Sequence, residues 1–136
     1  MLFICRRHFE GMCQEKNEDE IAKDILKSIE KAYGFIPVVN QVLSERPDLF
    51  IPSSNLGRSV FYGKGELQKK YRYLAALSAA VALGAEHCME VQMKMAVKFG
   101  ATKNEILETM QIAAVMSMTH AQSHAFRKYR EMFPEE

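Results

Sequence analysis

Residues 100–106 have the sequence Gly-Ala-Thr-Lys-Asn-Glu-Ile, and this stretch decides how the second half of the chain folds. Gly100 suits the left-handed backbone that commonly follows the last turn of a helix. Thr102 and Glu105 have the spacing of a capping box, in which the hydroxyl accepts the N–H three residues on and the carboxylate reaches back. The stretch therefore predicts that one helix ends near Phe99 and that another begins after Thr102.

Helical patterns extend from this stretch in both directions. Toward the N-terminus, residues 68–83 and 86–99 are predicted helices separated by Gly84. The first of them is alanine-rich and apolar on most sides, so we expect it at the centre of the fold. Toward the C-terminus, residues 117–119 predict a kink or short turn before a last helix over residues 120–132.

The first half of the chain is also helical in pattern. Apolar residues at helical spacing follow Asn17, a residue that commonly caps a helix, and Gly34 is placed to end this helix. Further helices are expected from Pro37 or Val38, and over residues 47–62, while no alternating strand pattern occurs. The predicted fold is all-α, a compact bundle of six to seven helices over residues 17–136, preceded by an N-terminal arm at residues 1–16.

Composition excludes several classes of function. The 18 Lys+Arg nearly balance the 17 Asp+Glu, and no basic face occurs, which argues against nucleic-acid binding. The short basic run at residues 69–72 is interpreted as a solvated helix start. The longest apolar run, residues 74–83, is well short of the roughly 20 residues that span a bilayer, so we expect no membrane segment and a cytoplasmic location.

The number and spacing of the cysteines also favour a cytoplasmic protein over a secreted one. Cys5, Cys13 and Cys88 are odd in number and irregularly spaced, unlike the disulfide framework of a secreted domain. No Cys-x-x-Cys, zinc-ribbon or His-Glu-x-x-His pattern occurs, so no metal site and no cofactor are predicted.

Residues 83–88 (Leu-Gly-Ala-Glu-His-Cys) and 97–106 together resemble the carboxymuconolactone decarboxylase/alkylhydroperoxidase D family. Residues 34–37 (Gly-Phe-Ile-Pro) and the pair Arg46-Pro47 are similar to its N-terminal half, so the resemblance covers roughly residues 30–130. It implies the alkylhydroperoxidase D-like helical fold, a small-molecule substrate, and a homo-oligomer, either a trimer or a hexamer.

The same resemblance implies a partly depleted redox site. In family members that act as peroxidases, a glutamate, two cysteines and a histidine form a proton relay and a thiol–disulfide couple. Cys88 matches the second cysteine and His87 the histidine that often precedes it. Ala85 stands in the place of the first cysteine, Gln92 in that of the relay histidine and Tyr73 in that of the glutamate.

The first functional hypothesis is a thiol-dependent, peroxiredoxin-type peroxidase activity through Cys88. A cysteine in the first turn of a helix lies in a partial positive charge that favours thiolate. His87, His120 or His124 is the candidate base, and an external thiol or one of the N-terminal cysteines would resolve the sulfenate. The alternative for Cys88 itself is a buried packing residue.

Two other functions stay open. One is a decarboxylase or lactone-type enzyme, in which His120 and His124 share a helix face. Tyr73, Gln92 and Arg127 would then complete its polar pocket. The other is a non-catalytic oligomeric binding protein, because three of the relay positions hold residue types that cannot do the family's chemistry. Whether the chain is an enzyme is therefore left undecided by its sequence.

Overall fold

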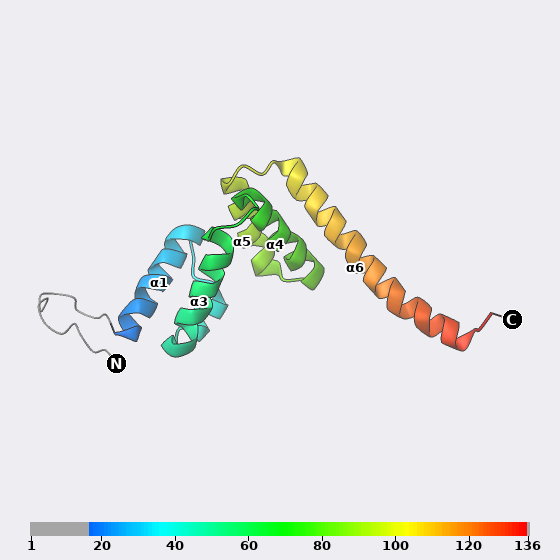
Figure 1. Cartoon of the computed structure of the whole chain (residues 1–136), viewed down its shortest axis with the longest axis horizontal. Helices are drawn as coiled ribbons and strands as arrows, with labels where there is room; N and C mark the ends of the chain where they lie inside the picture. The colour runs from blue at the N-terminus through cyan, green and yellow to red at the C-terminus, as the bar shows by residue number, and fades with distance from the viewer. Residues whose placement is uncertain (1–16, 136) are drawn as a thin grey trace, which may run out of the picture.

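The computed structural model describes residues 17–135, and the arm predicted at residues 1–16 lies outside the described residues, as does residue 136. Over the described range the chain consists of helices and their connections, which confirms the all-α class (Figure 1). The helices are α1 (Glu18–Tyr33), α2 (Val38–Leu43), α3 (Pro47–Tyr62), α4 (Lys69–Leu83), α5 (Glu86–Lys98) and α6 (Lys103–Met132).

The predicted caps form as the sequence indicates. The side chain of Asn17 accepts the backbone N–H of Glu20 at 2.9 Å and begins α1. Gly34 ends that helix with a φ of 83°, which favours glycine. At the start of α6 the hydroxyl of Thr102 accepts the N–H of Glu105, and the Glu105 carboxylate accepts the N–H of Thr102 at 2.8 Å. Two of the four orphan N–H donors of this helix start are therefore satisfied by side chains.

Helix α4 lies at the centre of the fold, as its composition predicts. It packs against α3, α5 and α6, and α1 packs against α3. In Figure 1 the α1–α3 pair lies on one side of α4 and α5, and α6 lies on the other. Leu77 of α4 and Ala96 of α5 are completely buried, and Ala113 of α6 is almost so. Small residues at these contacts let the helix axes approach closely.

The expected kink at residues 117–119 is wrong, because α6 runs unbroken for 30 residues. The Ser117 hydroxyl donates to the carbonyl of Ala113 at 2.9 Å, and the Thr119 hydroxyl donates to that of Val115 at 3.0 Å. These hydroxyls bond back within their own helix instead of ending it. The two helices predicted here are therefore one.

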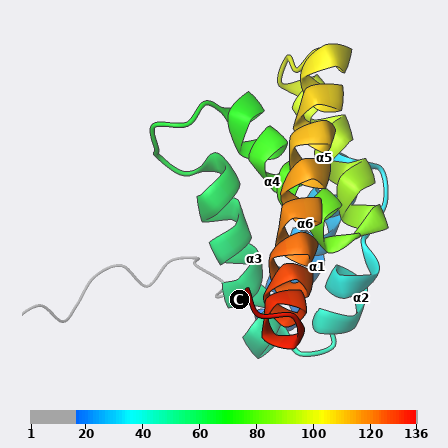
Figure 2. The ribbon, with the colours of Figure 1, turned by 90° about the vertical axis from the view of Figure 1, so that its right-hand side faces the viewer.

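The consequence is a long helix that leaves the bundle. At about 1.5 Å per residue α6 is roughly 45 Å long. Its first half packs against α4, and its second half extends past the other helices toward the C-terminus (Figure 1). Figure 2 views the molecule along this direction, with α6 in front of α4 and α5. The bundle itself is formed by the other helices and the first half of α6.

Candidate functional site

The turn between α4 and α5 places Cys88. Gly84 has a φ of 66°, a left-handed value that lets the chain reverse, and the N–H of Ala85 bonds to the carbonyl of Ala80 at 2.9 Å. Helix α5 then begins at Glu86, so Cys88 is its third residue. No side chain caps this helix start, and N–H groups of the first turn are left without a helical partner.

The thiol of Cys88 is free and exposed in this chain. The alternative interpretation, in which Cys88 is a buried packing residue, is therefore wrong for the single chain. An exposed sulfur at a helix N-terminus is accessible to a small-molecule oxidant or to an alkylating reagent. That accessibility is the property that a reactive cysteine requires.

His87 is exposed and adjacent to Cys88 in the sequence, but its side chain interacts electrostatically with Glu90. Successive residues of a helix point about 100° apart and do not face each other. The Lys94 ammonium lowers the pKa of Glu90, and His87 adds a smaller electrostatic contribution to that lowering. His87 therefore lies on the side of Glu90, three residues on, and it remains close to Cys88 only through the backbone.

Tyr73, in the place of the family's glutamate, is part of the hydrophobic core. Its ring is stacked between Phe61, with centroids 4.8 Å apart, and Phe99, with centroids 5.3 Å apart. The residue is 1% exposed, and its hydroxyl has no hydrogen-bond partner. Burial, with the neighbouring Tyr62 adding to it, holds the pKa of Tyr73 far above its ordinary value. This hydroxyl cannot replace a carboxylate as a proton acceptor near neutral pH.

Gln92 and Ala85 fill the other two relay positions. The carboxamide oxygen of Gln92 is buried on α5 without a hydrogen-bond partner. An amide does not titrate, so Gln92 cannot pass a proton as a histidine does. Ala85 is the residue at the N-cap of α5, and its methyl group offers no second sulfur. None of the three residues that the resemblance places at relay positions can therefore supply a titrating group near neutral pH or a second sulfur.

The two histidines of α6 contact each other and not Cys88. The rings of His120 and His124 meet edge to face with centroids 4.6 Å apart, and His124 Nδ1 lies 3.4 Å from a guanidinium nitrogen of Arg127. Over residues 17–135, no hydrogen bond, ion pair or ring contact joins either histidine to Cys88, Tyr73 or Gln92. Their stretch of α6 is exposed throughout.

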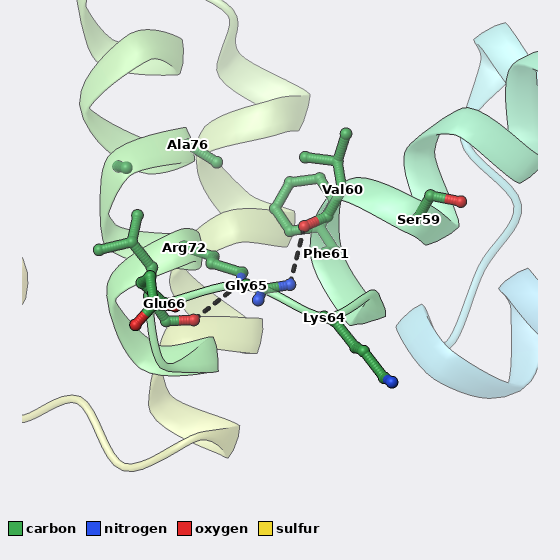
Figure 3. A pocket seen from close by; sticks show the side chains of 10 residues that line it. Ser59, Val60, Phe61, Lys64, Gly65, Glu66, Arg72 and Ala76 are labelled. Carbon is green, nitrogen blue, oxygen red and sulfur yellow. Dashed lines mark hydrogen bonds between the residues drawn. The ribbon is translucent and has the colours of Figure 1, made fainter.

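A shallow depression of about 530 Å³ lies elsewhere, between the end of α3, the following loop and α4 (Figure 3). Its floor is mostly apolar, with Val60, Phe61 and Ala76 among the lining residues. The Arg72 guanidinium at its edge donates to the carbonyls of Val60, Gly63 and Leu67. This cation is occupied in holding the loop, and none of the predicted site residues lines the depression.

The basic run at residues 69–72 is only partly the solvated helix start that its sequence indicated, because Lys69 is exposed while Lys70 and Arg72 have partners. Besides the Arg72 bonds to the loop, the Lys70 ammonium lies 2.8 Å from Glu105, and the exposed fractions of the two side chains are 22% and 32%. Positive residues at a helix N-terminus oppose the helix dipole. That local conflict was the signal in the sequence that tertiary partners hold these side chains.

Residues 17–135 contain no cluster of three or more His, Cys, Asp or Glu side chains that could hold a metal ion. None of the helices in that part of the chain is long and apolar enough to cross a membrane.

The described residues form an all-α fold in which the exposed Cys88 lies in the first turn of α5, directly after the α4–α5 turn. The family model described as "Carboxymuconolactone decarboxylase family" matches residues 47–131, and the chain belongs to this family. It is also 30% identical over 83 residues to an uncharacterized protein of Methanocaldococcus jannaschii, which covers 60% of this chain and 77% of the relative.

Proposed function

We propose that this chain is a thiol-dependent peroxidase that works through one cysteine, Cys88. The observation that carries the proposal is the exposed, unpaired thiol in the uncapped first turn of α5. The partial positive charge of a helix N-terminus favours negative charge at such a position, both on the attacking sulfur and on an oxidised sulfenate. Membership of the family supports the choice of this turn as the site.

The proposed cycle needs a hydroperoxide and a low-molecular-weight thiol. The Cys88 thiolate attacks the distal peroxide oxygen, the O–O bond breaks, and the alkoxide or hydroxide leaves and takes a proton. Cys88 is then a sulfenic acid. One external thiol condenses with it to a mixed disulfide and releases water, and a second thiol attacks that disulfide and restores the Cys88 thiol. Two thiols are oxidised to one disulfide for each peroxide reduced.

The relay positions explain why an external thiol is required. A dithiol cycle needs a second sulfur one helical turn away, and Ala85 holds a methyl group there. Proton transfer through Tyr73 is opposed by its buried hydroxyl, whose pKa is raised. Cys5 and Cys13, the other candidate resolving residues, lie outside the described residues.

The test combines trapping and turnover in the full chain. After mild peroxide treatment, a sulfenate-trapping dione should label Cys88, as located by mass spectrometry, and peroxide should be consumed in the presence of a small thiol. Cys88→Ser should abolish both, whereas a Cys5→Ser/Cys13→Ser double variant should retain both. A folded wild-type chain whose Cys88 is neither alkylated nor oxidised would refute the proposal and favour a non-catalytic binding protein.

None of the three candidate histidines contacts the Cys88 thiol, so we propose that the step with peroxide rests on the helix N-terminus and not on a histidine base. His87 lies on the side of Glu90, and the two histidines of α6 contact each other. His87→Gln and His120→Gln/His124→Gln should therefore each leave the rate of Cys88 oxidation by peroxide unchanged. A decarboxylase or lactone-type activity that depends on the α6 pair would instead be lost in the His120→Gln/His124→Gln variant.

A further inference from the structure

The Arg72 guanidinium, at the edge of the depression between α3, the following loop and α4, is held in one orientation (Figure 3). Its Nε donates to the carbonyl of Leu67 at 2.8 Å, and its Nη1 donates to the carbonyls of Val60 at 3.0 Å and Gly63 at 2.9 Å. Bonds to three separate residues fix a side chain that is otherwise flexible. The guanidinium is therefore preorganised, and a ligand that binds it need not order it first.

The positive charge of Arg72 has no negative partner. The bonds to the loop use three of its five N–H donors, and their acceptors are neutral carbonyls. Within residues 17–135, the two N–H groups of Nη2 have no acceptor and Arg72 forms no ion pair. That includes Glu66, an exposed acidic residue that also lines the depression. A carboxylate is the ligand group with which such donors form strong, charge-assisted hydrogen bonds.

Gly65 keeps the space in front of Arg72 Nη2 open. A Cβ atom at this position would lie 2.8 Å from Nη2, closer than Cβ atoms normally approach another heavy atom. The φ of Gly65 is not positive, so its backbone conformation does not require glycine. What requires the absence of a side chain is the space beside the guanidinium, and both residues line the depression.

The rest of the depression selects what is attached to the anion. Its volume of about 530 Å³ falls in the range of roughly 300–1,000 Å³ that is typical of small-molecule sites. The polar ends of Ser59 and Lys64 point away from Arg72 in Figure 3. Further polar groups on a ligand would therefore lose hydration there without gaining partners. The remaining lining is apolar, and it consists of Val60, Phe61, Leu67, Ala75 and Ala76.

We propose that this depression, which we call the Arg72 site, binds a medium-chain fatty acid. The carboxylate accepts hydrogen bonds from Arg72 Nη2 beside Gly65, and the acyl chain lies on the apolar floor. A flexible hydrocarbon chain suits a shallow site, because it can follow one surface, whereas a flat ring needs walls on both faces. The proposal does not depend on the chemistry of Cys88, which does not line the site.

The first experiment compares three ligands by nuclear magnetic resonance of the isotope-labelled full chain. Octanoate should shift the backbone amide signals of residues 59–67 and 72–76 in a saturable way. Butyrate has the charge with a shorter chain, and octanol has the chain without the charge. Each should bind at least about 10-fold more weakly, since a buried methylene contributes up to roughly 4-fold and the carboxylate supplies the charged partner. No octanoate shifts in these residues, or equal affinities for octanoate and octanol, would overturn the proposal.

The second experiment locates the carboxylate with two matched variants. Gly65→Ala keeps the Arg72 charge but places a methyl group against Nη2, and it should weaken octanoate binding at least about 10-fold without affecting octanol. Lys64→Gln removes an equal charge from the same loop and should change octanoate affinity by less than about 3-fold, because the Lys64 ammonium is exposed and points away. Wild-type octanoate affinity in Gly65→Ala, or an equal loss in both variants, would contradict the proposal.

Arg72→Gln removes the cation itself and should abolish the difference in affinity between octanoate and octanol. This variant also loses bonds that hold the loop after α3, so it is interpreted only if its amide spectrum remains that of a folded chain. If it does not fold, the ligand comparison and Gly65→Ala still decide the question. A folded Arg72→Gln variant that still prefers octanoate to the same extent would refute the assignment of the carboxylate to Arg72.

Discussion

Replacing Tyr73 with phenylalanine should stabilise the protein, although the resemblance to the family predicts that Tyr73 stands at a relay position. The ring lies between Phe61 and Phe99, and phenylalanine retains both stacking contacts. Only the hydroxyl is removed, and this hydroxyl is buried without a hydrogen-bond partner. Its removal relieves the cost of dehydrating a polar group that forms no full hydrogen bond and gains only a weaker interaction with the neighbouring Tyr62 hydroxyl.

The magnitude follows from the burial of the residue. An unsatisfied buried donor or acceptor costs about 1–3 kcal/mol, and Tyr73 is 1% exposed, so little of that cost is recovered from solvent. Proximity to the Tyr62 hydroxyl reduces the cost, and we therefore expect a gain of about 1 kcal/mol. In a domain of this size the gain corresponds to a rise in Tm of about 4 °C. Tyr73→Ala should instead lose about 3–5 kcal/mol, because it removes the ring and leaves a cavity.

Urea denaturation followed by circular dichroism measures both variants, at one protein concentration so that self-association does not alter the comparison. Tyr129→Phe, an exposed tyrosine on α6, is the matched control and should change stability by less than about 0.5 kcal/mol. A Tyr73→Phe variant less stable than wild type would refute the reasoning, since it would mean that the hydroxyl makes a favourable hydrogen bond. Its sulfenate formation at Cys88 should match that of wild type.

Three further predictions concern the contacts that hold α4 and α6. Thr102→Ala removes an N-cap acceptor and should lower the free energy of unfolding, measured by denaturation, by about 1 kcal/mol. Thr102→Ser should keep most of the stability of wild type. The hydrogen bond from the Lys70 ammonium is the largest of the interactions that lower the pKa of the Glu105 carboxyl group below its ordinary value of 4.5. Glu105 therefore stabilises the fold above about pH 4.5, and its contribution is lost as pH falls through the lowered pKa, so wild type and Glu105→Gln should converge in stability in acid. Arg72→Ala frees three loop carbonyls and should cost about 2 kcal/mol, of which Arg72→Lys recovers less than half.

Each of these has an outcome that contradicts it. Equal stabilities for Thr102→Ala and wild type would mean that another group satisfies the first turn of α6. A difference between wild type and Glu105→Gln that stays constant from pH 7 to pH 3 would exclude the ion pair as its cause. Wild-type stability in Arg72→Ala would show that the loop after α3 is held by its own backbone.

Local signals in the sequence predicted most of the helix boundaries. Asn17, Gly34, Gly84 and the Thr102–Glu105 pair act within one turn of the backbone, so their effect can be read without knowledge of the rest of the chain. The kink expected near Ser117 failed for a related reason. A serine or threonine side chain can interrupt a helix, or its hydroxyl can donate to a backbone carbonyl one turn earlier in the same helix. The sequence does not distinguish these two outcomes.

The candidate site was predictable in its residues but not in their surroundings. The sequence identified Cys88, Tyr73 and Gln92 by resemblance, and no local pattern predicted that the first is exposed while the other two have buried, unpartnered polar atoms. It also grouped His120 and His124 with Cys88 as one site. The structure gives them contacts with each other and with Arg127 and none with Cys88, and the helix that carries them extends past the rest of the bundle (Figure 1).

By itself, therefore, the sequence determined that the chain is all-α, where most of its helices begin and end, and which cysteine lies in the first turn of α5, because caps and periodicity depend on neighbours along the chain. Only the tertiary structure decided that Tyr73 is a core residue, that Lys70 and Arg72 have partners, and that the second half of α6 is exposed. These properties depend on which helices pack together, and packing brings together residues that are far apart in the sequence.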